Sequence, residues 1–198
     1  MSRINERLSP PREPLDDGVI RNMVAGYALV DALAFERVDL FAMGNLKYWL
    51  DLNTTVLCGT DPIARAEYTS HRQTTEQRFY EGAEGGIRDL VEWNQGRGGE
   101  SVWMRAAGLY IRLLSRPQLF VEGNHRTGAL AISYVLVSEN EPPFVLTPQY
   151  AATYFDPSTV IKNTEKQGLA MRFRSPGLTK QLASFLAEHA DRRYLRSR

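Results

Sequence analysis

The segment from His125 to Ser138 constrains the fold most strongly, because it predicts a helix with apolar residues on nearly every side. A helix on the surface of a globular protein carries one apolar stripe, so a helix that is apolar all round must be enclosed by other elements. Pro142 and Pro143 prevent this helix from continuing. We therefore expect a fold that is built around the 125–138 helix.

A second helix is predicted directly before it. Ser101 can cap a helix that runs to Ser115 with apolar residues on one face, and Pro117 ends it. The two helices would form the central pair of an all-α domain. Between them lies the motif segment, residues 118–128, which reads Gln-Leu-Phe-Val-Glu-Gly-Asn-His-Arg-Thr-Gly.

The residue types of the motif segment predict a phosphate-binding turn. Gly123 permits a backbone conformation that a side chain would forbid, and Asn124 tolerates left-handed geometry. A helix that starts near His125 directs free N–H groups and the positive end of its dipole at an anion, and Arg126 can grip two phosphate oxygens. Glu122 is an oxygen ligand suited to a Mg²⁺ ion that bridges phosphates. The alternative is an ordinary turn at a helix start with a surface arginine.

The motif segment resembles the signature loop of the Fic (Fido) family, usually written H-x-F-x-(D/E)-G-N-G-R-x-x-R. The resemblance covers roughly residues 40 to 140 and implies a Fic-like helical domain. Members of that family mostly transfer AMP from ATP to a hydroxyl of a target protein. The resemblance thus implies a nucleotide such as ATP as substrate, Mg²⁺ as cofactor and a target protein as partner. The matching residues are Phe120, Glu122, Gly123, Asn124 and Arg126.

Three positions depart from the family pattern. Gln118 stands where the family has the histidine that serves as general base, and an amide cannot hold a proton near neutral pH. A positioned base contributes about 10²- to 10⁴-fold in rate, so this change weakens the chemistry. His125 replaces the second glycine, and Ala129 replaces the final arginine that would clamp a phosphate. The site has drifted toward another reaction or toward binding without turnover.

His125 leaves two roles open. It could act as a displaced base, because the start of a helix favours a neutral imidazole. It could instead contribute only its backbone N–H to the anion site. His71 and His189 lie far away in the sequence, and we expect both to be solvated.

Further helices are predicted around the central pair. Asp16 and Asp17 suit the cap of a first helix, and Pro176 after Ser175 is a typical start for the last one. Two more helices are expected at 36–52 and 87–95. The stretch from Tyr68 to Glu81 lacks a helical period, and it is interpreted as either a small β-hairpin flap or a plain loop. The resembled family carries such a flap in this part of the chain.

Composition is typical of one globular unit. The chain has 198 residues, of which 43% are hydrophobic and 24% charged, with a formal net charge of +1. This charge gives no reason to expect nucleic acid or a membrane as partner. We expect an extended arm at residues 1–15 and a single domain at 16–198. One cysteine, Cys58, suits a cytoplasmic protein, and no uninterrupted apolar run is long enough to span a bilayer.

The expected function is that of a Fic-like nucleotidyltransferase with reduced or altered activity. The alternative is an inactive nucleotide-binding regulatory protein. Some Fic proteins carry an inhibitory helix with a Ser-x-x-x-Glu motif, which Ser184 and Glu188 match. The arginine with which the glutamate would pair is Ala129 here, so we interpret this match as chance.

Overall fold

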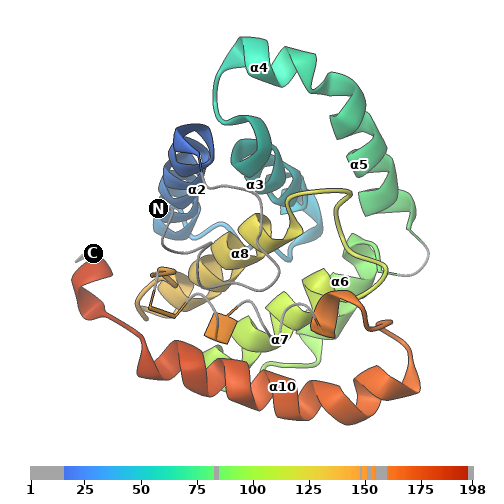
Figure 1. Cartoon of the computed structure of the whole chain (residues 1–198), viewed down its shortest axis with the longest axis vertical. Coiled ribbons are helices and arrows are strands. Elements are labelled where there is room, and N and C mark those ends of the chain that lie inside the picture. The colour runs from blue at the N-terminus through green and yellow to red at the C-terminus, as the bar shows by residue number, and fades with distance from the viewer. Residues whose placement is uncertain (1–15, 83–84, 148, 151–152, 155–159, 196–198) are drawn as a thin grey trace.

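The computed structural model describes residues 16–82, 85–147, 149–150, 153–154 and 160–195, and helices dominate these residues (Figure 1). No β-strand occurs within them, so the all-α prediction is confirmed. The predicted arm at residues 1–15 lies outside the described residues. The elements are α2 (Asp17–Phe35), η1 (Met43–Asn45), α3 (Lys47–Cys58), α4 (Pro62–Glu67), α5 (Thr69–Glu81), α6 (Ile87–Gln95), α7 (Val102–Leu114), α8 (Asn124–Ser138), α10 (Leu169–Glu188) and η2 (Arg192–Tyr194).

Helix α8 lies at the centre of the molecule, as its apolar sequence predicts. It is buried along most of its length and contacts α2, α3 and α7. Helix α10 packs along α7, and α6 also contacts α7 (Figure 1). The predicted central pair, α7 and α8, therefore forms the middle layer of the fold.

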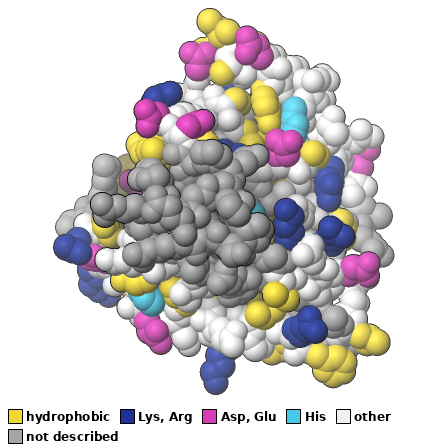
Figure 2. Space-filling view, viewed as in Figure 1, with side chains coloured by type: hydrophobic (Ala, Val, Ile, Leu, Met, Phe, Trp, Pro, Cys, Tyr) yellow, Lys and Arg dark blue, Asp and Glu magenta, His cyan; other side chains and the backbone are white. Residues whose placement is uncertain are grey.

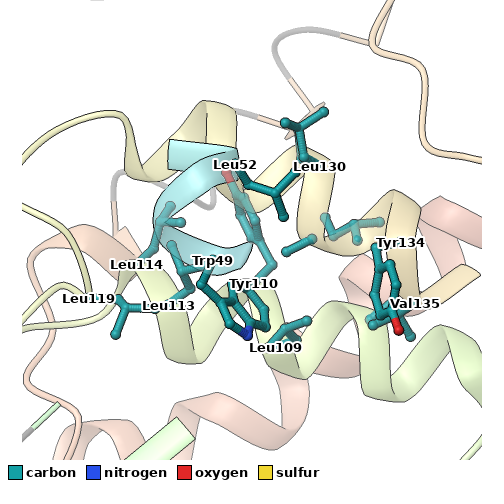
Figure 3. Close-up of a cluster of buried hydrophobic side chains, with 14 of the residues drawn as sticks. Trp49, Leu52, Leu109, Tyr110, Leu113, Leu114, Leu119, Leu130, Tyr134 and Val135 are labelled. Atoms are coloured by element: carbon teal, nitrogen blue, oxygen red, sulfur yellow. The ribbon is translucent and has the colours of Figure 1, made fainter. Parts of the chain in front are cut away.

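Side chains from α3, α7 and α8 converge in the core (Figure 3). Trp49 is fully buried, and its indole Nε1 donates to the carbonyl of Leu40 at 2.8 Å. The hydroxyl of Tyr134 likewise donates to the carbonyl of Val38. Each large apolar side chain contributes about 1.5–3 kcal/mol when it is buried, and the two hydrogen bonds satisfy the polar ends of the aromatic groups.

Helix α2 begins where the sequence predicts. The side chain of Asp16 accepts from the backbone N of Val19 at 2.7 Å, which is an N-cap. This 19-residue helix contains an 18-residue window with a mean hydropathy of 1.3, so α2 is long and apolar enough to cross a membrane. In the structure, α2 packs one side against α3 and α8, with Gly26 against Leu130, and only 22% of its apolar window is buried.

The hairpin interpretation of Tyr68–Glu81 is wrong, because helix α5 occupies this stretch from Thr69 onward. Only Thr75 and Phe79 of α5 are buried, so the sequence carries too few apolar residues to reveal a helical period. Short helix α4, capped by Asp61, precedes it.

Two predicted helix boundaries are also wrong. The helix expected at 36–52 begins only at Lys47 and continues to Cys58, where Gly59 with a φ of +72° ends it. The last helix begins at Leu169, so Pro176 lies inside it and not at its first position. Proline has no N–H to donate, so Pro176 removes one backbone hydrogen bond from the helix.

Leu130→Ala tests whether α8 carries the fold. Leu130 has 0% exposure, so we expect the free energy of unfolding to fall by about 2–5 kcal/mol. The matched control is Ile63→Ala, which removes as many carbons from a side chain that is 72% exposed, and it should change stability by less than about 0.5 kcal/mol. Urea unfolding followed by circular dichroism measures both. Equal losses in the two variants would contradict the central role of α8.

Candidate functional site

The motif loop, residues 115–123, joins α7 to α8 and turns at Gly123. This residue has a φ of +71° and forms the N-cap of α8, so the left-handed conformation predicted for the turn is present. A Cβ atom at this position would lie 2.9 Å from Nδ2 of Asn53 and 3.1 Å from Leu57. Both the backbone and the close packing therefore require glycine.

Asn124 fixes the shape of the motif loop. Its Oδ1 accepts from the backbone N of Phe120 at 3.0 Å, and its Nδ2 donates to the carbonyl of Phe120 at 2.8 Å. The same Nδ2 lies 3.3 Å from Oε1 of Gln118. Asn124 is only 5% exposed and is the first residue of α8, so the left-handed turn residue is Gly123. Its side chain positions the loop and does not face a ligand.

The first turn of α8 offers backbone donors. The first backbone hydrogen bond inside the helix runs from the N of Thr127 to the carbonyl of Gly123 at 2.9 Å. The N–H groups of residues 124–126 precede that bond, as at every helix start. The dipole of a 15-residue helix adds partial positive charge at the same place.

Glu122 and Arg126 flank this helix start. The carboxylate of Glu122 is exposed, and its Oε2 accepts from the hydroxyl of Tyr68 at 3.2 Å. One guanidinium nitrogen of Arg126, Nη1, donates to the carbonyl of Val56 at 2.7 Å. That bond uses one of the five donors of the guanidinium and orients the group. The structure thus brings together the charged side chains that the sequence predicted as phosphate and metal contacts.

Gln118 lies at the other end of the motif loop. Its Nε2 donates to the carbonyl of Leu114 at 3.1 Å, so the amide closes the end of α7. Its backbone carbonyl accepts from Nε of Arg78, on α5, at 2.8 Å. With the contact to Asn124, these bonds make Gln118 part of the support of the loop.

His125 faces α7 and not Gln118. Its Nδ1 lies 3.0 Å from the hydroxyl of Tyr110, which is buried on α7. Either atom can donate in this hydrogen bond, depending on the tautomer of the imidazole. Nε2 of His125 is a proton acceptor only when Nδ1 carries the proton and donates to Tyr110. The structure therefore orients His125 without fixing its protonation.

Tyr68 and His71 are site residues that sequence reasoning missed. Burial together with Glu122 raises the pKa of Tyr68 to about 12, so its hydroxyl stays a donor to Glu122. The ring of His71 is centred 4.6 Å from that of Tyr68, and its Nε2 is buried with no hydrogen-bond partner among the described residues. His71 is half-buried, so it is only partly solvated. Glu122 lies 54 positions after Tyr68, so no local pattern could reveal the contact.

The other histidine and the inhibitory motif lie elsewhere. His189 is exposed, but its ring is centred 4.0 Å from that of Tyr150 and its Nδ1 contacts the carbonyl of Phe185, so it is only partly solvated. Ser184 and Glu188 are exposed on α10, which packs along α7.

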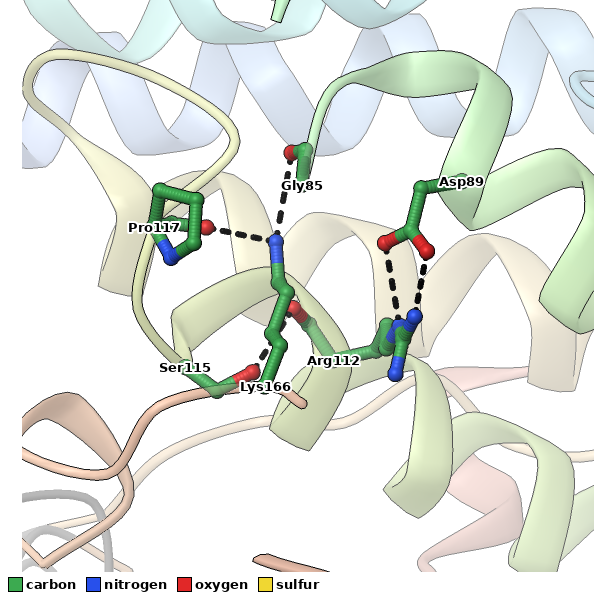
Figure 4. Close-up of polar contacts among 6 residues, drawn as sticks. All are labelled: Gly85, Asp89, Arg112, Ser115, Pro117 and Lys166. Atoms are coloured by element: carbon green, nitrogen blue, oxygen red, sulfur yellow. Dashed lines mark hydrogen bonds and ion pairs between the residues drawn. The ribbon is translucent and has the colours of Figure 1, made fainter. Parts of the chain in front are cut away.

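Lys166 holds the start of the motif loop (Figure 4). Its Nζ donates to the carbonyl of Pro117 at 2.6 Å and to that of Gly85 at 3.2 Å. The residue is only 6% exposed, and burial lowers its pKa to about 8. The carboxylate of Asp89 opposes this decrease, but Asp89 is itself paired with Arg112. A buried ammonium thus joins the loop to the start of α6.

Glu122 is the carboxylate beside the start of α8 that could take part in holding Mg²⁺, and its Oε2 also accepts from Tyr68. Among the described residues there is no group of three or more His, Cys, Asp or Glu side chains that could hold a metal alone. Mg²⁺ is commonly held by one or two carboxylates together with substrate phosphates, and Glu122 offers one such carboxylate.

Comparison of the chain with protein-family models, curated proteins and solved structures finds no match in any of the three.

The buried ammonium of Lys166 makes a prediction about stability and pH. Its folded pKa of about 8 lies below the ordinary value of 10.5, so between these values the unfolded chain binds more protons. Stability therefore rises with pH in this window, by at most about 1.4 kcal/mol per pH unit. We therefore expect the unfolding free energy of the wild type minus that of Lys166→Met to become more positive from pH 8 to 9.5.

Urea unfolding of both proteins at several pH values measures this difference. The raised pKa values of Cys58, Tyr27 and Tyr68 act in both proteins, so they cancel in the comparison. A difference that stays constant or decreases over this range would contradict the lowered pKa of Lys166.

Proposed function

We propose that this protein binds a nucleotide or a related phosphate compound at the start of α8, in the manner of Fic proteins. Its reaction class is the transfer of AMP, or of a related phosphate-containing group, to a hydroxyl of a protein. One observation carries the proposal. Helix α8 begins directly after Gly123, whose backbone is left-handed, and Glu122 and Arg126 lie on either side of this helix start. Backbone donors, a cation and a carboxylate together match a phosphate that is shared with Mg²⁺.

The residues of this phosphate cradle, 122–126, take different parts in binding. The N–H groups of the first turn of α8 contact one group of phosphate oxygens. The donors of Arg126 that are not bonded to Val56 contact other phosphate oxygens. Glu122 binds Mg²⁺, which offsets the negative charge of the phosphates when it is present. The side chain of Asn124 supports the cradle through its bonds to Phe120, and only the backbone N–H of this residue faces the ligand.

Transfer requires a proton acceptor. The oxygen of the target hydroxyl forms a bond to the α-phosphorus, pyrophosphate leaves, and the proton of the hydroxyl passes to a base. The amide of Gln118 cannot accept that proton. His125 serves as base only in the tautomer that donates from Nδ1 to Tyr110. Positioning and charge stabilisation then supply most of the acceleration.

A regulatory protein that binds nucleotide without turnover is the second candidate. It is favoured by the bonds of Gln118 to Leu114 and Asn124, because they use the side chain as a support of the loop. In both cases the ligand is a nucleotide or a related phosphate compound. We place the protein in the cytoplasm, with neither nucleic acid nor membrane as partner. The single cysteine and the net charge of +1 support that placement.

Arg126→Ala tests the phosphate cradle. The variant removes a charged donor from bound phosphate, so we expect the binding of ATP with Mg²⁺ to weaken by about 1.5–3 kcal/mol in calorimetry. Arg105→Ala is the matched control, because it removes a half-buried arginine that pairs with Glu139 away from the cradle. ATP affinity that is unchanged in Arg126→Ala, or equally reduced in both variants, would contradict the assignment.

Gln118→His tests the limit on turnover. The unmodified protein should transfer AMP from radiolabelled ATP slowly or not at all, and the histidine should raise any transfer because it restores a proton acceptor. Ala129 is only 8% exposed and belongs to the core cluster, so an arginine there would disturb the packing, and Gln118→His is tested alone. Strong labelling by the unmodified protein would refute the inactive reading. Its loss in His125→Ala, with the fold intact by circular dichroism, would assign the base to His125.

A further inference from the structure

A second site lies at the opposite end of the motif loop, in a cavity of about 670 Å³. Its walls come from the end of α5, the start of the motif loop and the segment before α10. The charged residues that line it are Arg78, Arg116, Lys162, Lys166 and Glu165, and Gln118 lines it as well. Figure 2 shows Lys and Arg side chains close together on the right of this face, over the motif loop and the end of α5.

The charge of this cavity is unusual for the chain. Four cations and one carboxylate line it, whereas the whole chain carries a formal net charge of +1. Within the described part of the chain, the ion pairs involve other arginines, such as Arg105 and Arg112. Several like charges that face one cavity raise the energy of the empty site, and an anionic ligand relieves this repulsion.

The walls of the cavity are held by backbone and buried polar contacts. The N of Arg116 donates to the carbonyl of Thr164 at 2.9 Å, and the N of Lys166 donates to the carbonyl of Arg116 at 2.7 Å. Nε of Arg78 is held by the carbonyl of Gln118. Two carbonyls bind the Lys166 ammonium and use two of its three protons. The charged groups of Arg78 and Lys166 are therefore held in place, and the backbone bonds fix the segments that carry Arg116 and Lys162.

The size and lining of the cavity define the ligand. Its volume falls in the range of small-molecule sites, about 300–1,000 Å³, and exceeds what a single phosphate fills. Among the described residues that line it, none carries an aromatic ring on which a base could stack. Arginine and lysine together are typical of contacts to phosphate oxygens.

We propose that this cavity binds a small polar compound carrying two phosphate groups or a pyrophosphate group. Its cation-lined walls recognise the phosphates, and no nucleobase is required. Glu122 and Arg126 do not line the cavity, so the site is separate from the phosphate cradle and does not depend on the function proposed for it.

Binding of inorganic pyrophosphate without Mg²⁺, measured by calorimetry, tests the proposal. The wild-type protein should bind pyrophosphate more tightly than inorganic phosphate, because the cavity holds enough cations for both phosphate groups. Arg116→Ala and Lys162→Ala should each raise the Kd for pyrophosphate about tenfold, the loss expected for one charged hydrogen bond. Both side chains are exposed, so these changes leave the core intact.

Lys180→Ala is the matched control for Lys162→Ala, because it removes the same charge from an exposed position on α10 outside the cavity lining. The Kd for pyrophosphate should stay within about twofold in this control and in Arg126→Ala. Absence of pyrophosphate binding to the wild type would overturn the proposal. So would equal weakening in Lys180→Ala, or a loss in Arg126→Ala that the cavity variants do not share.

Discussion

The buried amide of Asn124 is the interaction on which the candidate site depends. It accepts from the backbone N of Phe120 and donates to the carbonyl of the same residue, four positions earlier. A buried peptide group without partners costs about 1–3 kcal/mol, so these bonds allow Phe120 to enter the core beneath the loop. Phe120 then stacks on Phe79 with ring centres 5.9 Å apart, which joins the motif loop to α5. The exposed features of the loop are held on this buried support.

Asn53 provides a second fixed point on the other side of the loop. Its Nδ2 donates to the carbonyl of Glu122 at 2.9 Å and lies 3.0 Å from the hydroxyl oxygen of Thr127. Gly123 must stay without a side chain because the same Nδ2 occupies the space beside it. The conformation of the helix start is therefore set by a neighbour on α3 as well as by local preference. Arg126 also donates to a carbonyl of α3, that of Val56. Helix α3 therefore orients both the backbone and the positive charge of the cradle.

The sequence predicted the parts of this structure that local patterns determine. The all-round apolar character of α8, the cap at Asp16 and the turn at Gly123 each follow from a few neighbouring residues, and the structure has all three. Helix α5 was missed because it buries only two side chains and so lacks an apolar period. Pro176 was interpreted as a helix start, although α10 begins seven residues earlier.

Contacts between distant residues explain what the sequence could not predict about the site. Tyr68 meets Glu122 across 54 positions, and Asn53 meets the carbonyl of the same residue across 69. Lys166 reaches back 49 positions to Pro117. Such contacts depend on how the helices pack, and a single sequence contains no spacing rule for them. The chemical types of Glu122 and Arg126 were readable, whereas the residues that position them were not.

The motif loop is supported differently at its two ends, and this separates its chemistry into two regions. At the Gln118 end, Arg78 and the buried Lys166 bind backbone carbonyls, so two cations hold the loop there. At the Glu122 end, a neutral amide and a tyrosine hydroxyl provide the support, and the charges of the cradle stay available. Gln118 lies at the first end, where both polar atoms of its amide support the loop: Nε2 donates to the carbonyl of Leu114, and Oε1 lies 3.3 Å from Nδ2 of Asn124. Position 118 therefore serves the shape of the loop, and the cations beside it are held by backbone carbonyls.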